Sequence, residues 1–252
     1  MIDALNTGAS AVLAQQTGLD AIANDVANVN TSGYKATRTN FADLLYSPTR
    51  DDVPANQAPL NGTGAKVAGI QTIFNQGSLV QTGQSTDLAI AGDGFFAVTL
   101  PDGTQAYTRN GSFAPDANGT LVNSDGYMLN PPLKVPAGAA VKITSDGKVS
   151  TLQNGKSIVL GQLTLATFAN PDGLNKLGDN LYQVSANSGA AITGTPGNGN
   201  NGTIRSGYLE SSNVDLANAM TSLIEAQRAY QANARVITNA DQMMSIANNL
   251  RG

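Results

Sequence analysis

Residues 216–250 read LANAMTSLIEAQRAYQANARVITNADQMMSIANNL. Apolar and small side chains recur three and four residues apart along this stretch, which gathers them on one side of an α-helix. The predicted seam consists of Leu216, Met220, Leu223, Gln227, Tyr230, Ala234, Ile237, Asp241 and Met244, and Ile224, Ala240, Ala247 and Leu250 broaden it. Heptad spacing of this kind is typical of a helix that packs against another helix. We therefore expect a long C-terminal helix with a helical partner.

The N-terminal residues repeat the same spacing. Their predicted seam consists of Ile2, Leu5, Ala9, Val12, Gln16, Leu19, Ala23 and Val26. We expect this helix to end near Asn30, because Thr31, Ser32 and Gly33 are turn and cap residues. The segment from Ser212 to Asp215 predicts the start of the C-terminal helix, with the serine as its cap.

The two seams predict a subunit that assembles. Two helices that cover only each other would leave part of each apolar stripe in water, and the ordering of their residues costs free energy. We therefore expect the helical ends to be loosely held in a lone subunit and to become ordered when neighbouring copies cover them. The polar positions Gln16, Gln227 and Asp241 are interpreted as register devices. The alternative is a helical hairpin that packs within one molecule.

The middle of the chain predicts an antiparallel β domain. Asp-Gly and Asn-Gly pairs recur about every eight residues from Asp93-Gly94 to Asp125-Gly126, and each can form a tight hairpin turn. The strands expected between these and later turns cover 95–100, 105–108, 120–123, 140–144, 157–168 and 180–184. Two stretches rich in Pro, Gly and Asn, 47–69 and 187–201, are predicted connectors.

These patterns predict an α+β fold in which N- and C-terminal helices form a coiled-coil-like stalk and the centre is an antiparallel all-β domain. The expected organisation is an N-terminal stalk helix over 1–30, an extended connector with β pieces over 31–75, a β domain with a Gly/Asn-rich return segment over 76–211, and a C-terminal stalk helix over 212–252.

Composition excludes most enzyme chemistry. The chain has no His, Cys or Trp, so thiolate nucleophiles, imidazole bases and the usual zinc sites are ruled out. Charged residues are 13% of the chain and the net charge is −4, which argues against nucleic-acid binding. Neither a secretory signal peptide nor a membrane-spanning run is predicted. The lack of cysteine fits either a reducing cytoplasm or a chain that stays unfolded and uncrosslinked in transit.

Two sequence features suggest chemical sites, but neither fits the pattern that the chemistry needs. Residues 155–157 resemble the end of a phosphate-binding loop, but the glycine that such a loop requires upstream is absent. The carboxylates Asp93, Asp102, Asp125 and Asp146 suggest an acid/base pair, yet each precedes a glycine and is better explained by turn formation. We expect no catalytic, cofactor-binding or metal site and no small-molecule substrate.

Several segments resemble the bacterial flagellar rod and hook protein family. The N-terminal signature lies in 23–35, ANDVANVNTSGYK, and includes Asn24, Ala27, Asn28, Thr31, Gly33, Tyr34 and Lys35. Segments 74–79, 87–90, 92–98 and 107–113 resemble the β body of the family. The C-terminal signature lies in 207–215, with Ser212, Asn213 and Val214, followed by Gln227, Arg228, Ala229 and Tyr230. Asp25 departs from the family pattern, which usually has Asn there, and Ala219 stands where an acidic residue is frequent.

The resemblance is greatest to the distal rod members and implies a structural subunit rather than an enzyme. Such a subunit polymerises with copies of itself into an open helical tube that encloses the export channel and transmits torque from motor to hook. It implies neighbouring rod and hook subunits, surrounding ring proteins and the flagellar export apparatus as partners. It also implies a basal-body rod that crosses the periplasm, built from subunits exported without a cleaved signal peptide. The alternatives are a proximal rod or hook-type subunit, or a secreted carbohydrate-binding β protein with helical dimerisation ends.

Overall fold

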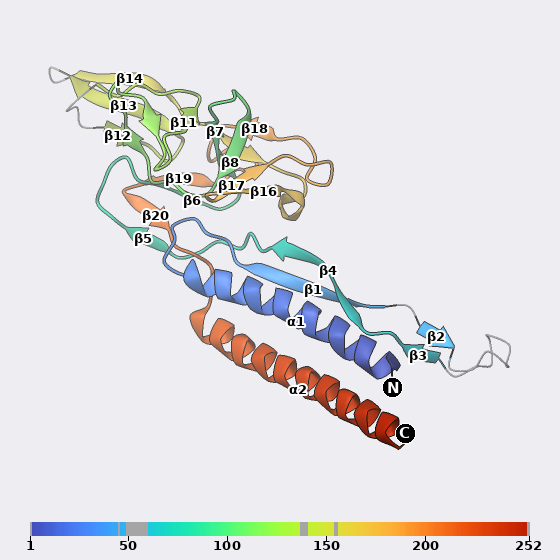
Figure 1. Cartoon of the computed structure of the whole chain (residues 1–252). Coiled ribbons are helices and arrows are strands. Elements are labelled where there is room, and N and C mark those ends of the chain that lie inside the picture. Colours follow the sequence, from blue (N-terminus) through green and yellow to red (C-terminus); the bar gives the residue numbers. More distant parts are fainter. Residues whose placement is uncertain (1, 45, 49–59, 137–140, 154–155, 251–252) are drawn as a thin grey trace. The chain divides into compact units, whose positions relative to one another are not determined.

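A computed structural model describes residues 2–44, 46–48, 60–136, 141–153 and 156–250. The chain divides into two compact units (Figure 1). The helix–ribbon unit comprises Met1–Ala27, Thr37–Thr72 and Asp215–Gly252. The β unit comprises Asn28–Ala36 and Ile73–Val214.

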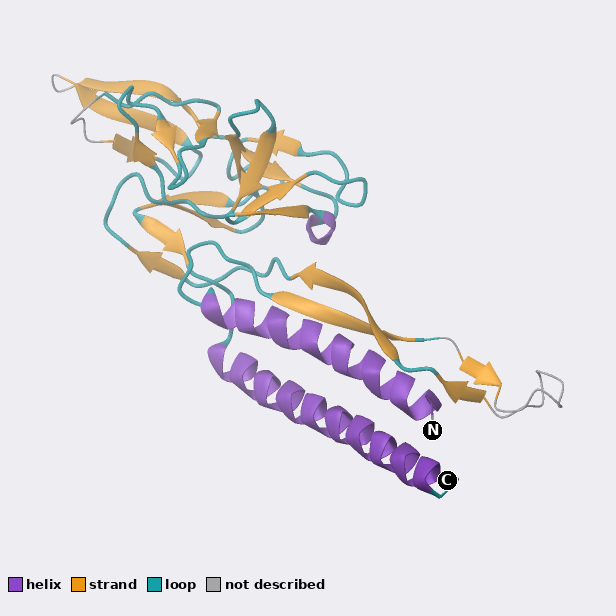
Figure 2. Cartoon of the chain, in the orientation of Figure 1, coloured by secondary structure: helices purple, strands orange, loops and turns teal. Residues whose placement is uncertain are grey.

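The helix–ribbon unit contains two long helices and a two-stranded ribbon. Helix α1 covers Ile2–Ala27 and helix α2 covers Leu216–Asn249, which at 1.5 Å per residue gives lengths of about 39 and 51 Å. The two helices contact each other along their lengths (Figure 2). Strands β1 (Thr37–Asp43) and β4 (Ala65–Thr72) pair antiparallel and contact α1, and β2 (Tyr46–Pro48) pairs with β3 (Leu60–Gly62).

The helix ends differ in detail from the predictions. Helix α1 stops at Ala27, three residues before Asn30. Helix α2 is capped by Asp215, whose carboxylate accepts from the backbone N–H groups of Ala217 and Asn218 at 2.9 and 3.2 Å. The predicted cap, Ser212, instead accepts from the N–H of Val214 in the segment before the helix. The prediction was wrong because Asp215 also satisfies the capping preference and lies directly before the first helical turn.

The β unit is built around a nine-stranded antiparallel sheet. Its main path runs β16 (Asn175–Gly178), β17 (Leu181–Gln183), β8 (Gln105–Thr108), β7 (Phe95–Thr99), β11 (Met128–Asn130), β10 (Leu121–Val122) and β9 (Ala114–Pro115), and β15 (Leu165–Thr167) pairs with both β7 and β18 (Ile192–Gly194). A three-stranded sheet contains β12 (Val141–Ile143), β13 (Lys148–Gln153) and β14 (Lys156–Gln162).

Two further strand pairs join the last strands of the β unit to its first strands. Strand β19 (Thr203–Ser206) pairs with β6 (Leu88–Ala91), and β20 (Tyr208–Glu210) pairs with β5 (Leu79–Gln81). A short 3₁₀ helix covers Pro171–Gly173. The predicted α+β fold, with helices at both ends of the chain and an antiparallel β centre, is confirmed.

Strand β7 supplies both hydrophobic clusters of the β unit. Phe96 and Val98 lie in the larger cluster with residues of β6, β10, β11, β13 and β15. Phe95 points the other way, as alternation along a strand requires, and packs edge to face against Phe168 and Tyr182. The sheet therefore has buried side chains on both faces at its centre.

The predicted turns use their glycines in two ways. At Gly94, Gly103, Gly119 and Gly126 the backbone φ is positive, a conformation that glycine adopts without steric cost. Gly111 is needed for space instead, because a methyl group on it would lie 1.6 Å from the carbonyl oxygen of Leu88. Neither helix is long and apolar enough, over its described residues, to cross a lipid bilayer.

Candidate assembly surfaces

One face of α2 is partly covered in the subunit. The residues of this face are Ala219, Leu223, Ala226, Ala229, Tyr230, Asn233, Ala234, Ile237, Ala240 and Met244, of which Ala240 is fully buried. They recur three or four residues apart, as expected for a face that contacts α1. Five predicted seam residues belong to this face: Leu223, Tyr230, Ala234, Ile237 and Met244.

The other predicted seam residues of α2 lie beside this face and are exposed. Leu216 and Met220 have 44% and 46% of their surface exposed, and Gln227 and Asp241 are also exposed. Small or short side chains one position earlier, such as Ala219, Ala226, Asn233 and Ala240, occupy the covered face. The polar residues interpreted as register devices therefore do not lie in the most buried part of the helix pair.

Helix α2 carries large apolar side chains on both sides of its covered face. Leu216, Met220 and Ile224 lie on one side, and Val236, Met243 and Leu250, each seven residues apart, lie on the other. Each of these six side chains is at least 44% exposed. Helix α1 therefore covers only part of the apolar surface of α2.

Helix α1 is packed closely on two sides through small residues. A methyl group on Gly8 would lie 3.0 Å from Cγ1 of Ile237 on α2, and one on Gly18 would lie 3.2 Å from the ring of Phe41 in the ribbon. Of the predicted seam, Leu5, Val12, Leu19 and Val26 are partly buried, Ala9, Gln16 and Ala23 are exposed, and the side chain of Ile2 lies outside the described part of the chain. Leu13, which the prediction left out, is 65% exposed.

Asp25 fastens the end of α1 to the start of β1. One carboxylate oxygen accepts from the backbone N–H of Thr37 at 2.9 Å and the other accepts from its hydroxyl at 3.0 Å. A carboxylate at this position accepts from two donors of one residue, and charge-assisted hydrogen bonds are the stronger kind.

Three charged side chains are buried together in the β unit. We call Lys35, Arg109 and Glu210 the charged junction. Nζ of Lys35 lies 2.6 Å from one carboxylate oxygen of Glu210, which also accepts from the backbone N–H of Gly77 at 2.9 Å. The lysine donates a second hydrogen bond to the carbonyl of Asn75 at 2.8 Å. Burial lowers the pKa of Lys35, and the carboxylate of Glu210 opposes that shift.

Arg109 completes the charged junction from the end of β8. Its guanidinium lies 3.4 Å from the second oxygen of Glu210, donates to the carbonyl of Gly92 at 3.0 Å and sits over the ring of Phe95 at 5.2 Å. One carboxylate thus faces two buried cations, and the charges are paired rather than isolated, as buried charges must be. Arg109 and Glu210 were not predicted as site residues, although they lie within the family-like segments 107–113 and 207–215.

The amide of Asn213 joins the same chain segments. Its oxygen accepts from the N–H of Ala36 at 2.7 Å, and its nitrogen donates to the carbonyls of Ile73 and Asn75 at 2.8 and 3.0 Å. The backbone N–H of Gly33 donates to the carbonyl of Glu210 at 2.7 Å. The segments that enter and leave the β unit are therefore tied together at this point.

The remaining signature residues are spread over both units. Asn28 and Thr31 hydrogen-bond through their side chains at 3.0 Å, and Tyr34 is buried with the ammonium of Lys176 over its ring. The others are surface positions: Asn24, Ala27, Gln227 and Arg228 are exposed, and Ser212, Val214, Ala229 and Tyr230 are partly buried. The structure thus brings Gly33, Lys35 and Asn213 to one place.

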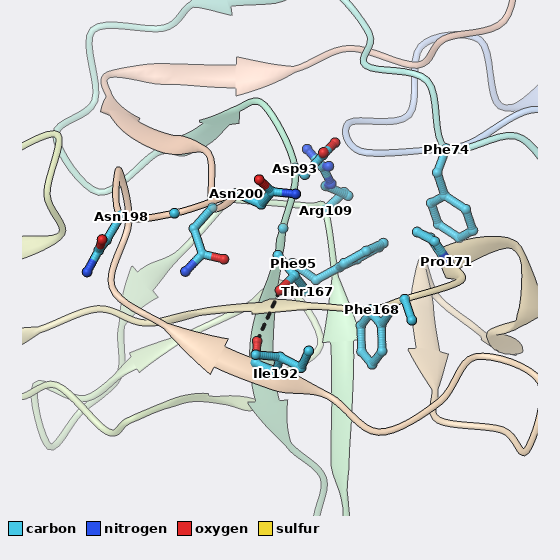
Figure 3. Close-up of a pocket in the computed structure, with 14 residues that line it drawn as sticks. Phe74, Asp93, Phe95, Arg109, Thr167, Phe168, Pro171, Ile192, Asn198 and Asn200 are labelled. Carbon is cyan, nitrogen blue, oxygen red and sulfur yellow. Dashed lines mark hydrogen bonds between the residues drawn. The ribbon is translucent and has the colours of Figure 1, made fainter.

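The described part of the β unit contains a cavity of about 600 Å³ (Figure 3). It is lined by the rings of Phe74, Phe95 and Phe168, with Arg109 and Asp93 near one another. Asp93 is the only carboxylate among its lining residues, whereas glycoside hydrolysis commonly needs two. Within the described residues, no group of three or more His, Cys, Asp or Glu side chains is placed to hold a metal ion.

Comparison with known proteins identifies the family. Three family models match: the flagella basal body rod protein over residues 5–35, the D1 domain of the flagellar hook protein FlgE/F/G over 89–151, and the C-terminal part of the flagellar basal body rod FlgEFG protein over 205–250. The flagellar basal-body rod protein FlgG of Borreliella burgdorferi is 44% identical over all of this chain and 99% of its own length, and that of Bacillus subtilis is 43% identical over the whole of both chains.

A more distant relative is the flagellar hook protein FlgE of Escherichia coli, which is 25% identical over 98% of this chain and 100% of its own length. The rod proteins share more identity with the chain than this hook protein does, so the similarity favours the rod members over a hook-type subunit. The chain belongs to the family of flagellar basal-body rod proteins, which are structural components of the flagellum rather than enzymes.

Proposed function

We propose that the chain is a distal rod subunit that polymerises into an open tube, transmits torque from motor to hook and encloses the export channel. The full-length similarity to basal-body rod proteins called FlgG supports the distal rod, and neighbouring rod and hook subunits follow from membership of the family. A secreted carbohydrate-binding protein is not favoured, because the relatives are rod and hook proteins over the whole chain.

The observation that best supports polymerisation is the uncovered apolar surface on both sides of the covered face of α2. A closed dimer uses one self-complementary patch, whereas two separate patches can each take a different neighbour. Contacts between different patches do not close on themselves, and they propagate as a helical assembly. Met220 on one side and Met243 on the other are 46% and 51% exposed, so covering the exposed part of each would add about 0.7 to 1.5 kcal/mol of gross stabilisation.

The parts of the chain have separate roles in this proposal. Residues 1–30 and 212–252 form the inner stalk, and their predicted seam residues contact neighbouring copies as well as each other. Residues 31–75 act as the connector, and 76–211 form the β domain of the subunit. The signature residues Lys35 and Asn213 hold the chain at the point where it enters and leaves the β unit.

Further partners are expected from a location in the basal body. We infer that the assembled rod crosses the periplasm and meets the surrounding ring proteins there. We also infer that each subunit passes through the flagellar export apparatus without a cleaved signal peptide. The lack of cysteine suits a chain that must stay uncrosslinked until it assembles.

The test places a charge on each side of α2 in turn. Ile224→Glu and Met243→Glu introduce a carboxylate at exposed apolar positions, and Gln242→Glu adds the same charge at an exposed polar position beside Met243. Sedimentation and electron microscopy should show tubes for the wild type and for Gln242→Glu, and only short or closed species for the other two. Circular dichroism reports whether each variant keeps its helices.

Tubes of wild-type length from both Ile224→Glu and Met243→Glu would show that these apolar side chains make no contact between subunits. The proposed use of α2 would then be wrong. A wild-type protein that stays monomeric or forms only closed dimers at high concentration would contradict the polymer itself.

A further inference from the structure

The three-stranded sheet of β12, β13 and β14 is covered on one face only. Val141, Ile143 and Val149 point inward and belong to the larger hydrophobic cluster of the β unit. The alternate residues Lys142 and Lys148 point outward and are exposed. In Figure 1 these strands lie at one end of the β unit, away from β16 and β18.

The outer face of this sheet combines positive charge with exposed aliphatic side chains. Lys142 is in register with Ser150, which is in register with Val159, so all three share this face. Leu152 lies two residues after Ser150 on the same face. Leu152 and Val159 are 61% and 64% exposed. We call Lys142, Lys148, Leu152 and Val159 the basic face.

Charge is distributed unevenly over the β unit. Residues 134–156 contain four lysines and one carboxylate, Asp146, so this segment carries +3 in a chain whose net charge is −4. Outside this segment and the charged junction, the β unit has seven carboxylates against two cations, a net charge of −5. These carboxylates are Asp87, Asp93, Asp102, Asp116, Asp125, Asp172 and Asp179, and none of them is buried.

Two of the carboxylates lie in turns at the same end of the strands β7, β8 and β11 of the large sheet. Thr99 at the end of β7 is in register with the first residue of β8 and also with Met128, the first residue of β11. The turns that lead into β8 and β11 are therefore neighbours, and they contain Asp102 and Asp125. Met128 is 46% exposed. We call Asp102, Asp125 and Met128 the acidic edge.

We propose that the basic face of one copy packs against the acidic edge of the next copy in the rod. This proposal rests on the proposed polymer and names a contact made by the β unit. The two patches are different surfaces of the same chain, so their pairing is head-to-tail and leaves a free patch at each end for another copy.

Charge complementarity and apolar contact have separate roles in this interface. Exposed ion pairs add little affinity singly, but complementary potentials orient the partners and disfavour wrong pairings. Leu152, Val159 and Met128 provide the apolar area that such a contact buries. An anionic polysaccharide would pair with the lysines, but it would leave these aliphatic side chains without a matching surface.

The test reverses the charge of each patch in a separate variant and then mixes the two variant proteins. Lys142→Glu/Lys148→Glu makes both patches of a subunit acidic, and Asp102→Lys/Asp125→Lys makes both basic. Each variant alone should assemble with a critical concentration at least about tenfold above that of the wild type at low salt. An equimolar mixture should form alternating copolymers, because every acidic patch then meets a basic one. Lys66→Glu/Lys176→Glu, with the same charge change at exposed positions outside the basic face, should assemble within about twofold of the wild type.

Asp102 also accepts from Thr104 within its turn, so reversal there could disturb folding. Asp102→Asn/Asp125→Asn keeps side-chain acceptors in both turns and should still raise the critical concentration and weaken its salt dependence. Normal assembly of folded Lys142→Glu/Lys148→Glu would overturn the proposal, and so would folded variants whose mixture fails to co-assemble. If Lys142→Glu/Lys148→Glu lost binding to an anionic polysaccharide but assembled normally, the basic face would belong to another partner, and the proposed contact between copies would also be overturned. A wild-type protein that forms no polymer would instead refute the underlying function.

Discussion

Replacement of Glu210 by alanine should destabilise the β unit more than any other single charge removal. The carboxylate is fully buried between Lys35 and Arg109, so its loss leaves two buried cations without their shared counter-ion. Removal of one partner from a buried ion pair costs about 3–5 kcal/mol. The N–H of Gly77 also loses its acceptor, and an unsatisfied buried donor costs about 1–3 kcal/mol more.

Equilibrium unfolding in urea, followed by tyrosine fluorescence, measures this effect. With a slope of about 2 kcal/mol/M, a combined loss of about 4–8 kcal/mol lowers the unfolding midpoint of the β unit by about 2–4 M. Glu225→Ala removes the other glutamate of the chain, which is exposed on α2, and should change the midpoint by less than about 0.3 M. Lys35→Met combined with Glu210→Gln should recover part of the loss, because it removes a cation and the carboxylate together.

The reasoning would be refuted if Glu210→Ala unfolded at the same urea concentration as Glu225→Ala. That result would mean that Lys35 and Arg109 find other partners or water when the carboxylate is absent. Equal and additive losses from Lys35→Met and Glu210→Gln would likewise show that the two side chains do not act as a pair.

Further predictions concern the turns of the β unit. Gly111→Ala should lower the free energy of unfolding, measured in urea, by about 3 kcal/mol or more, because the added methyl group would overlap the carbonyl oxygen of Leu88. Gly103→Ala meets open space and should lower it by about 1–2 kcal/mol, because alanine is strained at the positive φ of this position. Equal losses from the two variants would contradict this prediction. Hydrogen bonding to Lys148 lowers the pKa of Asp146 to about 2, so its contribution to stability is present above its ordinary pKa of 3.8 and is lost as the pH falls through 2. Its carboxyl carbon should titrate near pH 2 by nuclear magnetic resonance and move toward 3.8 in Lys148→Met, and an unchanged midpoint would show that the lysine is not the cause.

The strands and the helical ends could be predicted from the sequence because each has a local signal. The expected strand over 105–108 is β8 itself, and that over 95–100 contains β7, because Asp-Gly or Asn-Gly pairs flank both strands. The heptad spacing likewise predicted two long terminal helices. Short-range periodicity and turn residues therefore sufficed for the fold class.

The spacing of apolar residues along α2 did not fully determine which face of the helix packs against α1. Met220 was expected to face a helix partner, but in the subunit Ala219 lies on the covered face and Met220 is exposed. A helix with apolar residues on several sides has more than one possible seam, and the hydrophobic pattern favours the larger side chains. The two helices also approach closely where one residue is small, as at Gly8 of α1 against Ile237 of α2.

The pairing of the three side chains of the charged junction had no local signal. Lys35 and Glu210 are 175 residues apart, so no spacing rule connects them. Each side chain alone has the sequence context of an ordinary surface charge. Only the pairing of β20 with β5 brings Glu210 beside the segment that carries Asn75 and Gly77.

The central claim is that the terminal helices find their full complement only in adjacent copies. Hydrogen exchange of the backbone amides of α1 and α2, measured in dilute solution and again in the assembled polymer, tests it most directly. We expect fast exchange along both helices in the lone subunit and strong protection after assembly. Full protection of both helices in dilute solution, from a protein that shows no tendency to polymerise, would contradict it.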